Sequence, residues 1–427
     1  MKRLTIRLIK LQMGVNMDEK FVLTTILGEK YYDLDDLRYN KEAGFLFSRE
    51  QINEFLRAKD KFIDEGNKNF VKLPLKTFNS KHCFYVDGAY LSNTNNEYLS
   101  VLIDDFEENK VFLFDRNKSD IMQSRIFSEV EGTLRVENVP TTQKRIKEIF
   151  SDANPTEKND IIIKNMQNAL DFIITEEPSF NKDNLLKLYN LLSDNCLEEE
   201  NKLKKKHYYR DDSVSVGGYD GADAKDVDEM MDSLFAFVND PDSVKRYRVL
   251  LPLICHYYIV YVHPYFDYNG RTARMVSFWI SYIFKIETAP FFISEAINED
   301  KTNYYKAISN TRNTNNDLTY FLGYILENAI KFSLIYKNVE EIKSKLVLTG
   351  DFLTSAEQNY LKKIIIHNST GYFNHKMFLQ YINAEMSVPG RTKILNRLAG
   401  YNVLIKDVNK KGETIYKINQ DMLKYKF

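Results

Sequence analysis

Long apolar stretches separated by short polar segments predict a mostly helical protein. Residues 242–262 form a mostly apolar run that opens with a candidate N-cap, Asp242 or Ser243. Residues 271–284 form a second apolar run, and residues 318–332 form a third. Apolar segments of this length are typical of buried helices. Because Pro264 ends the first run, we expect a loop between two buried helices there.

The N-terminal region, residues 1–110, has a mixed pattern that predicts both helix and strand. Its expected elements are one helix and three strand-like runs, at 48–64, 83–91, 98–103 and 110–114. The strands would form a small antiparallel sheet. No candidate for chemistry stands out in this part of the chain.

The C-terminal region, residues 348–427, has different signals. Helices are expected at 354–367, 372–382 and 387–399, followed by two strands at 403–408 and 414–418. Thr354 with Glu357 forms a capping-box pattern, and Ser387 is the expected cap of the third helix. Three helices followed by a hairpin resemble a winged helix-turn-helix domain.

Charge gives this region a candidate partner. Residues 351–427 contain 12 Lys+Arg and 6 Asp+Glu, a net charge of +6, against −1 for the whole chain. The basic residues of the third helix and the hairpin tip are placed to contact DNA phosphates: Arg391, Lys393, Arg397, Lys410 and Lys411. No base-reading cluster accompanies them. Docking of a protein, or dimerisation, is therefore an open alternative to DNA binding.

Composition narrows the class of protein. The 427 residues are 44% hydrophobic, enough for one large core and one or two small ones. The three cysteines have no metal-binding spacing and no even pairing, which favours a reducing compartment. No apolar run approaches about 20 charge-free residues, and the basic N-terminus makes a poor signal peptide. We expect a cytoplasmic enzyme with no membrane span.

The loop between the two buried helices carries the candidate chemistry. It reads His263-Pro-Tyr-Phe-Asp-Tyr-Asn-Gly-Arg271-Thr-Ala-Arg274. If a helix starts near Asn269-Gly270, its free N–H groups form an anion site. Arg271 and Arg274, three residues apart, share one face of that helix and can bind neighbouring phosphates. Asp267 suits Mg²⁺, and His263 can accept a proton near neutral pH.

At these positions the chain resembles the Fic family, whose signature reads His-x-Phe-x-Asp/Glu-(Gly/Ala)-Asn-Gly/Lys-Arg-x-x-Arg. The matching residues are His263, Tyr265, Asp267, Tyr268, Asn269, Gly270, Arg271 and Arg274. The resemblance implies transfer of AMP from ATP to a protein hydroxyl, with release of pyrophosphate. It implies that His263 is the general base and that Asp267 holds Mg²⁺ between the α- and β-phosphates. It further implies that Asn269, Gly270 and Arg271 bind the α/β-phosphates, and that Arg274 meets the γ-phosphate.

Two positions depart from the family signature. Tyr265 stands where the family has Phe, a mild change if the ring packs inward and its hydroxyl finds a partner. Tyr268 stands where a small residue is usual. Its side chain could point to solvent, narrow the nucleotide pocket or change the preferred nucleotide.

A second segment resembles the inhibitory helix of many Fic proteins, Ser/Thr-x-x-x-Glu-Gly/Asn. Here Ser128, Glu131 and Gly132 match, while Phe127 replaces the first hydroxyl residue. We expect a helix that ends at Gly132. The resemblance implies that Glu131 pairs with Arg274 and blocks the γ-phosphate site in cis. A surface glutamate at an ordinary helix end is the alternative.

Two further segments fit the same family. Residues 208–218 predict a short strand and a glycine turn at the place of the family's target-docking flap. The candidate docking residues are Ser213, Val214, Ser215, Val216 and Gly217. Tyr304 and Tyr305 occupy the place of an aromatic pair on the adenine side, although core packing would use such residues equally well.

The sequence therefore predicts a mainly α protein. Its expected parts are an N-terminal α+β region (1–110), an inhibitory helix segment (111–150), a helical Fic core with a small β-hairpin flap (151–340) and a winged-helix domain (348–427). The expected function is adenylyl transfer from ATP with Mg²⁺ to a Ser, Thr or Tyr of a target protein. An ATP-sensing, DNA-associated regulator and a de-AMPylating enzyme are the alternatives. Homo-oligomerisation is left open.

Overall fold

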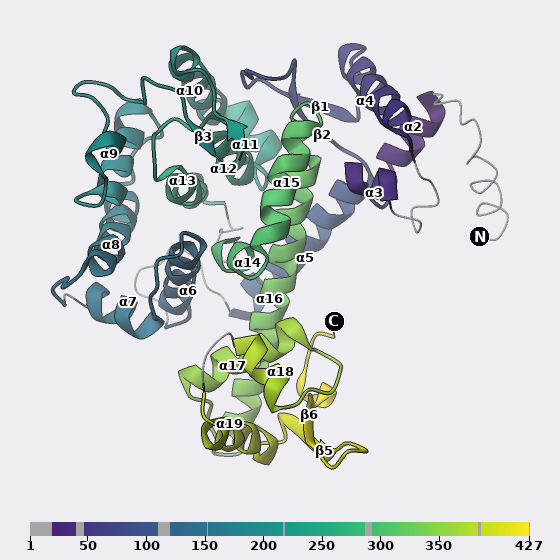
Figure 1. Ribbon diagram of the computed structural model, residues 1–427, viewed down its shortest axis with the longest axis vertical. Helices are drawn as coiled ribbons and strands as arrows, with labels where there is room; N and C mark the ends of the chain where they lie inside the picture. The colour runs from purple at the N-terminus through teal and green to yellow at the C-terminus, as the bar shows by residue number, and fades with distance from the viewer. Residues whose placement is uncertain are drawn as a thin grey trace. The chain divides into compact units, whose positions relative to one another are not determined.

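The structure is a computed structural model that describes residues 19–39, 47–109, 120–151, 153–216, 218–286, 293–382 and 386–426. Its residues divide into two compact units, one up to Ala329 and one from Ile330 to Phe427. The fold is mainly helical with three two-stranded antiparallel sheets among the described residues, as the sequence predicts (Figure 1). No helix within the described ranges is long and apolar enough to cross a membrane.

Two buried helices lie at the centre of the first unit. α12 (Leu251–Val262) has 11 buried residues out of 12, and α13 (Asn269–Ile283) has 12 of its 15. The other helices of this core are α8 (Lys158–Glu176), α9 (Lys182–Ser193), α10 (Ala224–Asn239), α11 (Pro241–Tyr247), α15 (Lys301–Asn313) and α16 (Thr319–Leu348). The predicted loop between two buried helices is confirmed.

The first of the predicted apolar helices is in fact two helices. α11 ends at Tyr247 and α12 begins at Leu251, because Pro252 has no N–H to continue the hydrogen-bond ladder of the preceding turn. The cap of α11 is Asp240, whose side chain accepts from the N–H groups of Asp242 and Ser243, so the predicted cap at Asp242 or Ser243 was wrong by two to three residues.

The N-terminal part of the first unit has a smaller sheet than predicted. The helix expected at 48–64 is α4 (Arg49–Asp64), and the described helices before it are α2 (Glu19–Ile26) and α3 (Leu34–Tyr39). β1 (Phe70–Leu73) pairs with β2 (Cys83–Val86). The strand expected at 98–103 is instead part of α5 (Ala89–Asn109), and the one expected at 110–114 lies outside the described residues. A residue-by-residue pattern cannot exclude helix where apolar and polar residues alternate only briefly.

The segment that resembles an inhibitory helix is indeed helical. α6 (Asp120–Val136) is followed by α7 (Gln143–Phe150), and α6 packs beside α14 (Ile293–Glu299), which is far away in the sequence (Figure 1). The predicted helix end at Gly132 is wrong, because the helix continues for another turn. A Cβ at position 132 would lie 2.7 Å from the nitrogen of Glu295, so glycine is required here for close helix packing.

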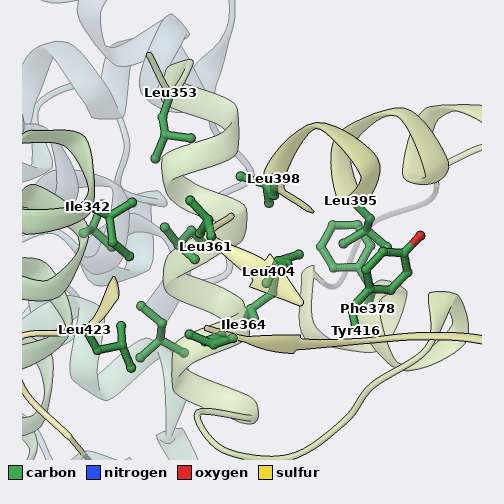
Figure 2. Packing of buried hydrophobic residues seen from close by; sticks show 14 of the residues in the cluster. Ile342, Leu353, Leu361, Ile364, Phe378, Leu395, Leu398, Leu404, Tyr416 and Leu423 are labelled. Carbon is green, nitrogen blue, oxygen red and sulfur yellow. The ribbon is translucent and has the colours of Figure 1, made fainter. Parts of the chain in front are cut away.

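The second unit contains the predicted order of three helices and a hairpin. These are α17 (Ser355–His367), α18 (His375–Ile382), α19 (Val388–Gly400), β5 (Leu404–Val408) and β6 (Thr414–Ile418). Thr354 and Glu357 form the predicted capping box, and Ser387 caps α19. Figure 2 shows the apolar core of this unit, with Leu361 and Ile364 of α17 close to Leu398 of α19 and Leu404 of β5. The boundary with the first unit falls within α16, not at residue 348.

Candidate active site

The loop between α12 and α13 begins and ends at residues in the left-handed region of backbone conformation. His263 (φ 56°) ends α12 and Tyr268 (φ 65°) precedes α13. The Asn269 side chain fixes the loop between them, because its Oδ1 accepts from the Tyr265 N–H at 3.0 Å and its Nδ2 donates to the Tyr265 carbonyl at 2.8 Å. Non-glycine residues in this conformation cost free energy and cluster at functional sites.

This use of Asn269 changes its expected role. Asn269 was expected to bind phosphate, but its side chain, which is 2% exposed, bonds the Tyr265 backbone through both Oδ1 and Nδ2. Asn269 therefore shapes the loop and starts α13. Its backbone N–H, in the first turn of α13, can face an anion.

The imidazole of His263 is neutral in this environment. Burial lowers its pKa to about 4, and the nearby charges of Arg210 and Arg312 act in the same direction, against a hydrogen bond to the Val260 carbonyl and the charge of Asp267. A neutral imidazole has a free lone pair and can accept a proton at neutral pH. The geometry therefore suits the predicted general base.

The pH dependence of catalysis should show this shift. Because His263 loses its proton near pH 4 rather than 6.5, the rate should not fall through protonation of His263 between pH 8 and about 5. Below pH 5 the rate should fall as His263 gains a proton. The measurement is kcat/KM against pH for AMP transfer. An acidic limb centred near pH 6.5 would contradict the assignment of His263 as the base.

Tyr265 packs inward, as expected, but its hydroxyl does not gain the expected partner. Its ring is fully buried and stacks on Tyr189 with a centroid distance of 3.7 Å. The Tyr265 hydroxyl is buried with no hydrogen-bond partner among the described residues. The aromatic ring of Tyr265, and not its hydroxyl, therefore supports the loop. The phenylalanine of the family signature would supply the same ring.

Replacing Tyr265 by Phe should leave the free energy of unfolding unchanged or raise it by about 1 kcal/mol, since an unpaired buried hydroxyl is costly. Tyr257→Phe is the matched control: its equally buried hydroxyl donates to Asn316 Oδ1 at 3.0 Å, so its loss should destabilise by about 1 kcal/mol. Urea unfolding monitored by circular dichroism gives both values. A clear destabilisation by Tyr265→Phe would show that its hydroxyl is satisfied.

Two arginines and a glycine make the start of α13 an anion site. Arg271 and Arg274 are 8% and 5% exposed, and the Nε of Arg271 has no acceptor among the described residues. A buried cation without a full set of acceptors is costly unless an anion joins it. Gly270 lies beside them and leaves the helix start open. The residues that were predicted to bind phosphate thus lie together at this helix start, and their binding of phosphate stays a prediction.

Asp267 is the candidate metal ligand. Its side chain is exposed in the loop, and one oxygen accepts from the Tyr268 N–H at 2.6 Å. No group of three potential metal ligands occurs among the described residues. Mg²⁺ is usually held by one or two carboxylates together with substrate phosphates. The site therefore fits Mg²⁺ that arrives with a nucleotide, and Asp267 would hold it.

Arg274 does not pair with Glu131 as expected. It pairs with Glu137 and also donates from Nε to Thr133 Oγ1. Glu131 instead accepts from Arg135, one turn further along the same helix, at 2.7 Å. Glu131 lies within α6 and Glu137 directly follows the last residue of that helix, and the two carboxylates have different partners, Arg135 and Arg274. The predicted Glu131–Arg274 contact is wrong.

A sequence signal for Glu137 was available. Thr133-Leu-Arg-Val-Glu137-Asn138 fits the inhibitory pattern at every defined position, whereas the segment at 127–132 fits it only in part. The side chain of Ser128 lies outside what the structure describes. The assumed helix end at Gly132 led to the wrong register.

The position of Glu137 is that of a bound anion. A Cβ on Gly270 would lie 2.7 Å from Glu137 Oε1, so the carboxylate sits directly over the start of α13. Burial would raise the pKa of Glu137, but the charges of Arg274 and Arg271 and the hydrogen bond from Arg274 outweigh it and lower the pKa. Glu137 is therefore a carboxylate at neutral pH and occupies the anion site.

The predicted flap is a short hairpin beside His263. β3 (Ser215–Val216) pairs with β4 (Tyr219–Asp220), while Gly217 and the side chain of Val216 lie outside the described part. Ser213 and Ser215 are exposed and Val214 is half-buried. A Cβ on Gly221, just after the hairpin, would lie 3.3 Å from the Cβ of His263, so the hairpin and the base are adjacent.

Arg210 joins the flap to the loop and was not predicted. It is 2% exposed and donates to the carbonyls of His263 (2.7 Å), Asp212 (2.6 Å) and Ala222. Burial lowers its pKa. Its partners are backbone oxygens, which carry no residue identity, so the sequence gives no sign of this role.

The aromatic pair on α15 separates into two environments. Tyr304 is buried and its hydroxyl lies 2.9 Å from His256 Nε2, so it belongs to the core. Tyr305 is 57% exposed and packs edge-on against Tyr304. Only Tyr305 is available to a ligand.

Taken together, this is a helical domain with a histidine of lowered pKa next to an arginine-rich helix start. Residues 179–281 match the model of the Fic/DOC family, so this stretch, from just before α9 through most of α13, is a Fic/DOC domain. Similar solved structures include a Fic family protein from Desulfovibrio desulfuricans, with 16% identity, 77% of this chain and 95% of that chain covered, and a TM-score of 0.47. A fragment of Fic-1 from C. elegans has 17% identity, 69% and 85% coverage, and a TM-score of 0.43.

Proposed function

We propose that this protein is an adenylyltransferase that moves AMP from ATP to a hydroxyl of a target protein and that Glu137 restrains it. Fic-domain proteins are typically AMP transferases, and the site supports the same chemistry here. One observation carries the proposal: Glu137, a carboxylate, pairs with Arg274 over Gly270, where a nucleotide phosphate would bind. A site that binds this carboxylate is preorganised for an anion.

The proposed reaction uses few groups of this chain. His263 takes the proton of the target hydroxyl while that oxygen attacks the α-phosphorus, and the bond to the pyrophosphate oxygen breaks. The N–H groups at the start of α13 and the guanidinium of Arg271 bind the phosphate oxygens. Mg²⁺ held by Asp267 would neutralise phosphate charge. Arg274 is available to the terminal phosphate only when Glu137 leaves it.

The flap gives the target a place to bind. Its two strands are short, and Ser213 and Ser215 are exposed beside the base. An extended target segment can add main-chain hydrogen bonds to a free strand edge, which would hold its hydroxyl near His263. Arg210 donates to the carbonyls of His263 and of Asp212, which precedes the hairpin. These bonds keep the strand edge that would bind the target at a fixed distance from the His263 imidazole.

Intact mass spectrometry after incubation with ATP and Mg²⁺ tests the proposal. The wild type, Glu137→Gly and Glu137→Gly/His263→Ala would each be incubated alone and with a cell extract whose proteins are then screened for bound AMP. Modification that appears with Glu137→Gly and disappears with the double variant supports adenylyl transfer. If Glu137→Gly modifies no protein in either arm, the transferase proposal fails.

A DNA-associated regulator is the second candidate, favoured by the exposed lysines of the C-terminal unit. Lys393 on α19 and Lys410 and Lys411 at the hairpin tip are exposed, as a phosphate-binding face requires. Arg397 does not fit this face, since it donates to the Tyr401 hydroxyl at 2.8 Å and lies 3.4 Å from Glu357. Salt-dependent binding to duplex DNA that is lost on replacing the three lysines would support this candidate.

A further inference from the structure

Arg271 has an unusual partner for a buried cation. Its guanidinium carbon lies 3.3 Å from the centre of the Tyr268 ring, and the two residues are 8% and 4% exposed. No salt bridge of Arg271 with a carboxylate occurs among the described residues, whereas its neighbour Arg274 is paired with Glu137. The main fixed partner of Arg271 is therefore an aromatic face.

Tyr268 is held firmly in this position. Its N–H donates to Asp267 Oδ1 at 2.6 Å, and its hydroxyl reaches the buried thiol of Cys196. Its φ of 65° is one that a tyrosine adopts only at a cost of order 1 kcal/mol. The contact of the backbone N–H and the contact of the phenol hydroxyl oppose that cost. Because the ring is buried, it does not point to solvent, which was one of the orientations that the sequence left open.

The geometry of stacking keeps the hydrogen-bond donors of Arg271 available. A guanidinium on an aromatic ring uses its flat face for the contact, while its N–H groups point outward in the plane. A carboxylate partner would use two of those N–H groups and would have to be displaced by phosphate. An aromatic ring orients the same cation without forming hydrogen bonds to its N–H groups. The Nε of Arg271, for example, has no hydrogen-bond partner among the described residues.

We propose that Tyr268 is a positioning residue for nucleotide binding: its ring holds the Arg271 guanidinium in a fixed plane with its donors free for the α/β-phosphates. This inference rests on the proposed function, because it takes a nucleotide as the ligand of Arg271. It assigns a role to Tyr268, one of the two residues at which the chain departs from the family signature. The aromatic face of Tyr268 orients the Arg271 guanidinium. The phenol hydroxyl has only an indirect part in this, because it contacts Cys196 and so helps to hold the ring.

Calorimetric binding of MgATP to the full chain tests this role. All variants carry Glu137→Gly, so that the anion site is free. Tyr268→Leu, which removes the π face, should weaken MgATP binding by about 3- to 30-fold, the range from an exposed to a desolvated cation–π contact. Tyr268→Phe keeps the face and should bind within about 2-fold of the parent. If Tyr268→Leu does not fold, Tyr268→Met replaces it as a flexible side chain without a ring.

A double-variant cycle separates positioning from a general structural effect. Arg271→Ala should weaken binding at least as much as Tyr268→Leu, and adding Tyr268→Leu to Arg271→Ala should cause no further loss. Parent-like binding by Tyr268→Leu, or an equal loss with and without Arg271, would overturn the proposal. These are binding measurements, so their failure is distinct from failure of the transferase proposal, which is judged by AMP transfer in the mass experiment.

Discussion

Replacing His263 by Ala in a Glu137→Gly protein is expected to reduce the rate of AMP transfer by about 10²- to 10⁴-fold, the usual contribution of a positioned general base. His263 is next to the flap, and burial keeps it neutral at the pH where it must accept a proton. The two arginines whose charges act on His263, Arg210 and Arg312, are cations and cannot take its place. The measurement is the initial rate of AMP incorporation.

Measuring the affinity for MgATP shows whether His263→Ala removes only the general base or also damages the nucleotide-binding site. His263→Ala should bind MgATP within about 2-fold of the parent, because the phosphate-binding groups lie on α13. His207→Ala is the matched control, since His207 is exposed and lies outside the loop. The assignment is wrong if His263→Ala lowers the rate by less than about 5-fold, or if it weakens MgATP binding in proportion.

Glu137→Gly is expected to raise the rate of AMP transfer by about 10- to 100-fold over the wild type. The estimate comes from a charge-assisted hydrogen bond worth roughly 1.5–3 kcal/mol, at about 1.4 kcal/mol for each factor of ten. The physical reason is competition: the Glu137 carboxylate covers Gly270 at the start of α13 and holds Arg274, with which the terminal phosphate would pair. The rate is measured at subsaturating ATP, where competition has its full effect.

Glu131→Gly is the matched control for this prediction. It also replaces a nearby glutamate by glycine, although at a position within α6 and not directly after its end, and its carboxylate bonds Arg135 rather than Arg274. Its rate should stay within about 2-fold of the wild type. Activation by Glu131→Gly without activation by Glu137→Gly would show that the contact with Arg274 is not the restraint.

The two predictions come from different kinds of information. The residues His263, Asp267, Gly270, Arg271 and Arg274 could be named from the sequence, because a short loop between two apolar runs fixes them next to each other along the chain. The glutamate that contacts Arg274 was named wrongly, because the helix was assumed to end at Gly132. The sequence offered two adjacent matches, a partial one at 127–132 and a full one at 133–138, and the structure shows that the glutamate of the second contacts Arg274.

Helix starts were predicted correctly where the signal lies in residues a few positions apart in the sequence. The capping box of Thr354 and Glu357 and the cap at Ser387 depend on residues three apart, so both were predicted correctly. The strand expected at 98–103 failed because a stretch of six residues carries too little periodicity to separate strand from helix, and here it continues a longer helix, α5.

By itself, the sequence determined the order of the main helices, the presence of a base and an anion-binding helix start in one loop, and the three helices and hairpin of the C-terminal unit. Local hydrogen bonding, apolar periodicity and near neighbours along the chain are enough for these features. The tertiary structure alone decided that Glu137 pairs with Arg274, that Arg210 joins the flap to His263, and that Tyr268 lies under Arg271. The first two of these contacts join residues more than 50 positions apart, and the third depends on which way a buried ring turns, so packing and not spacing sets them.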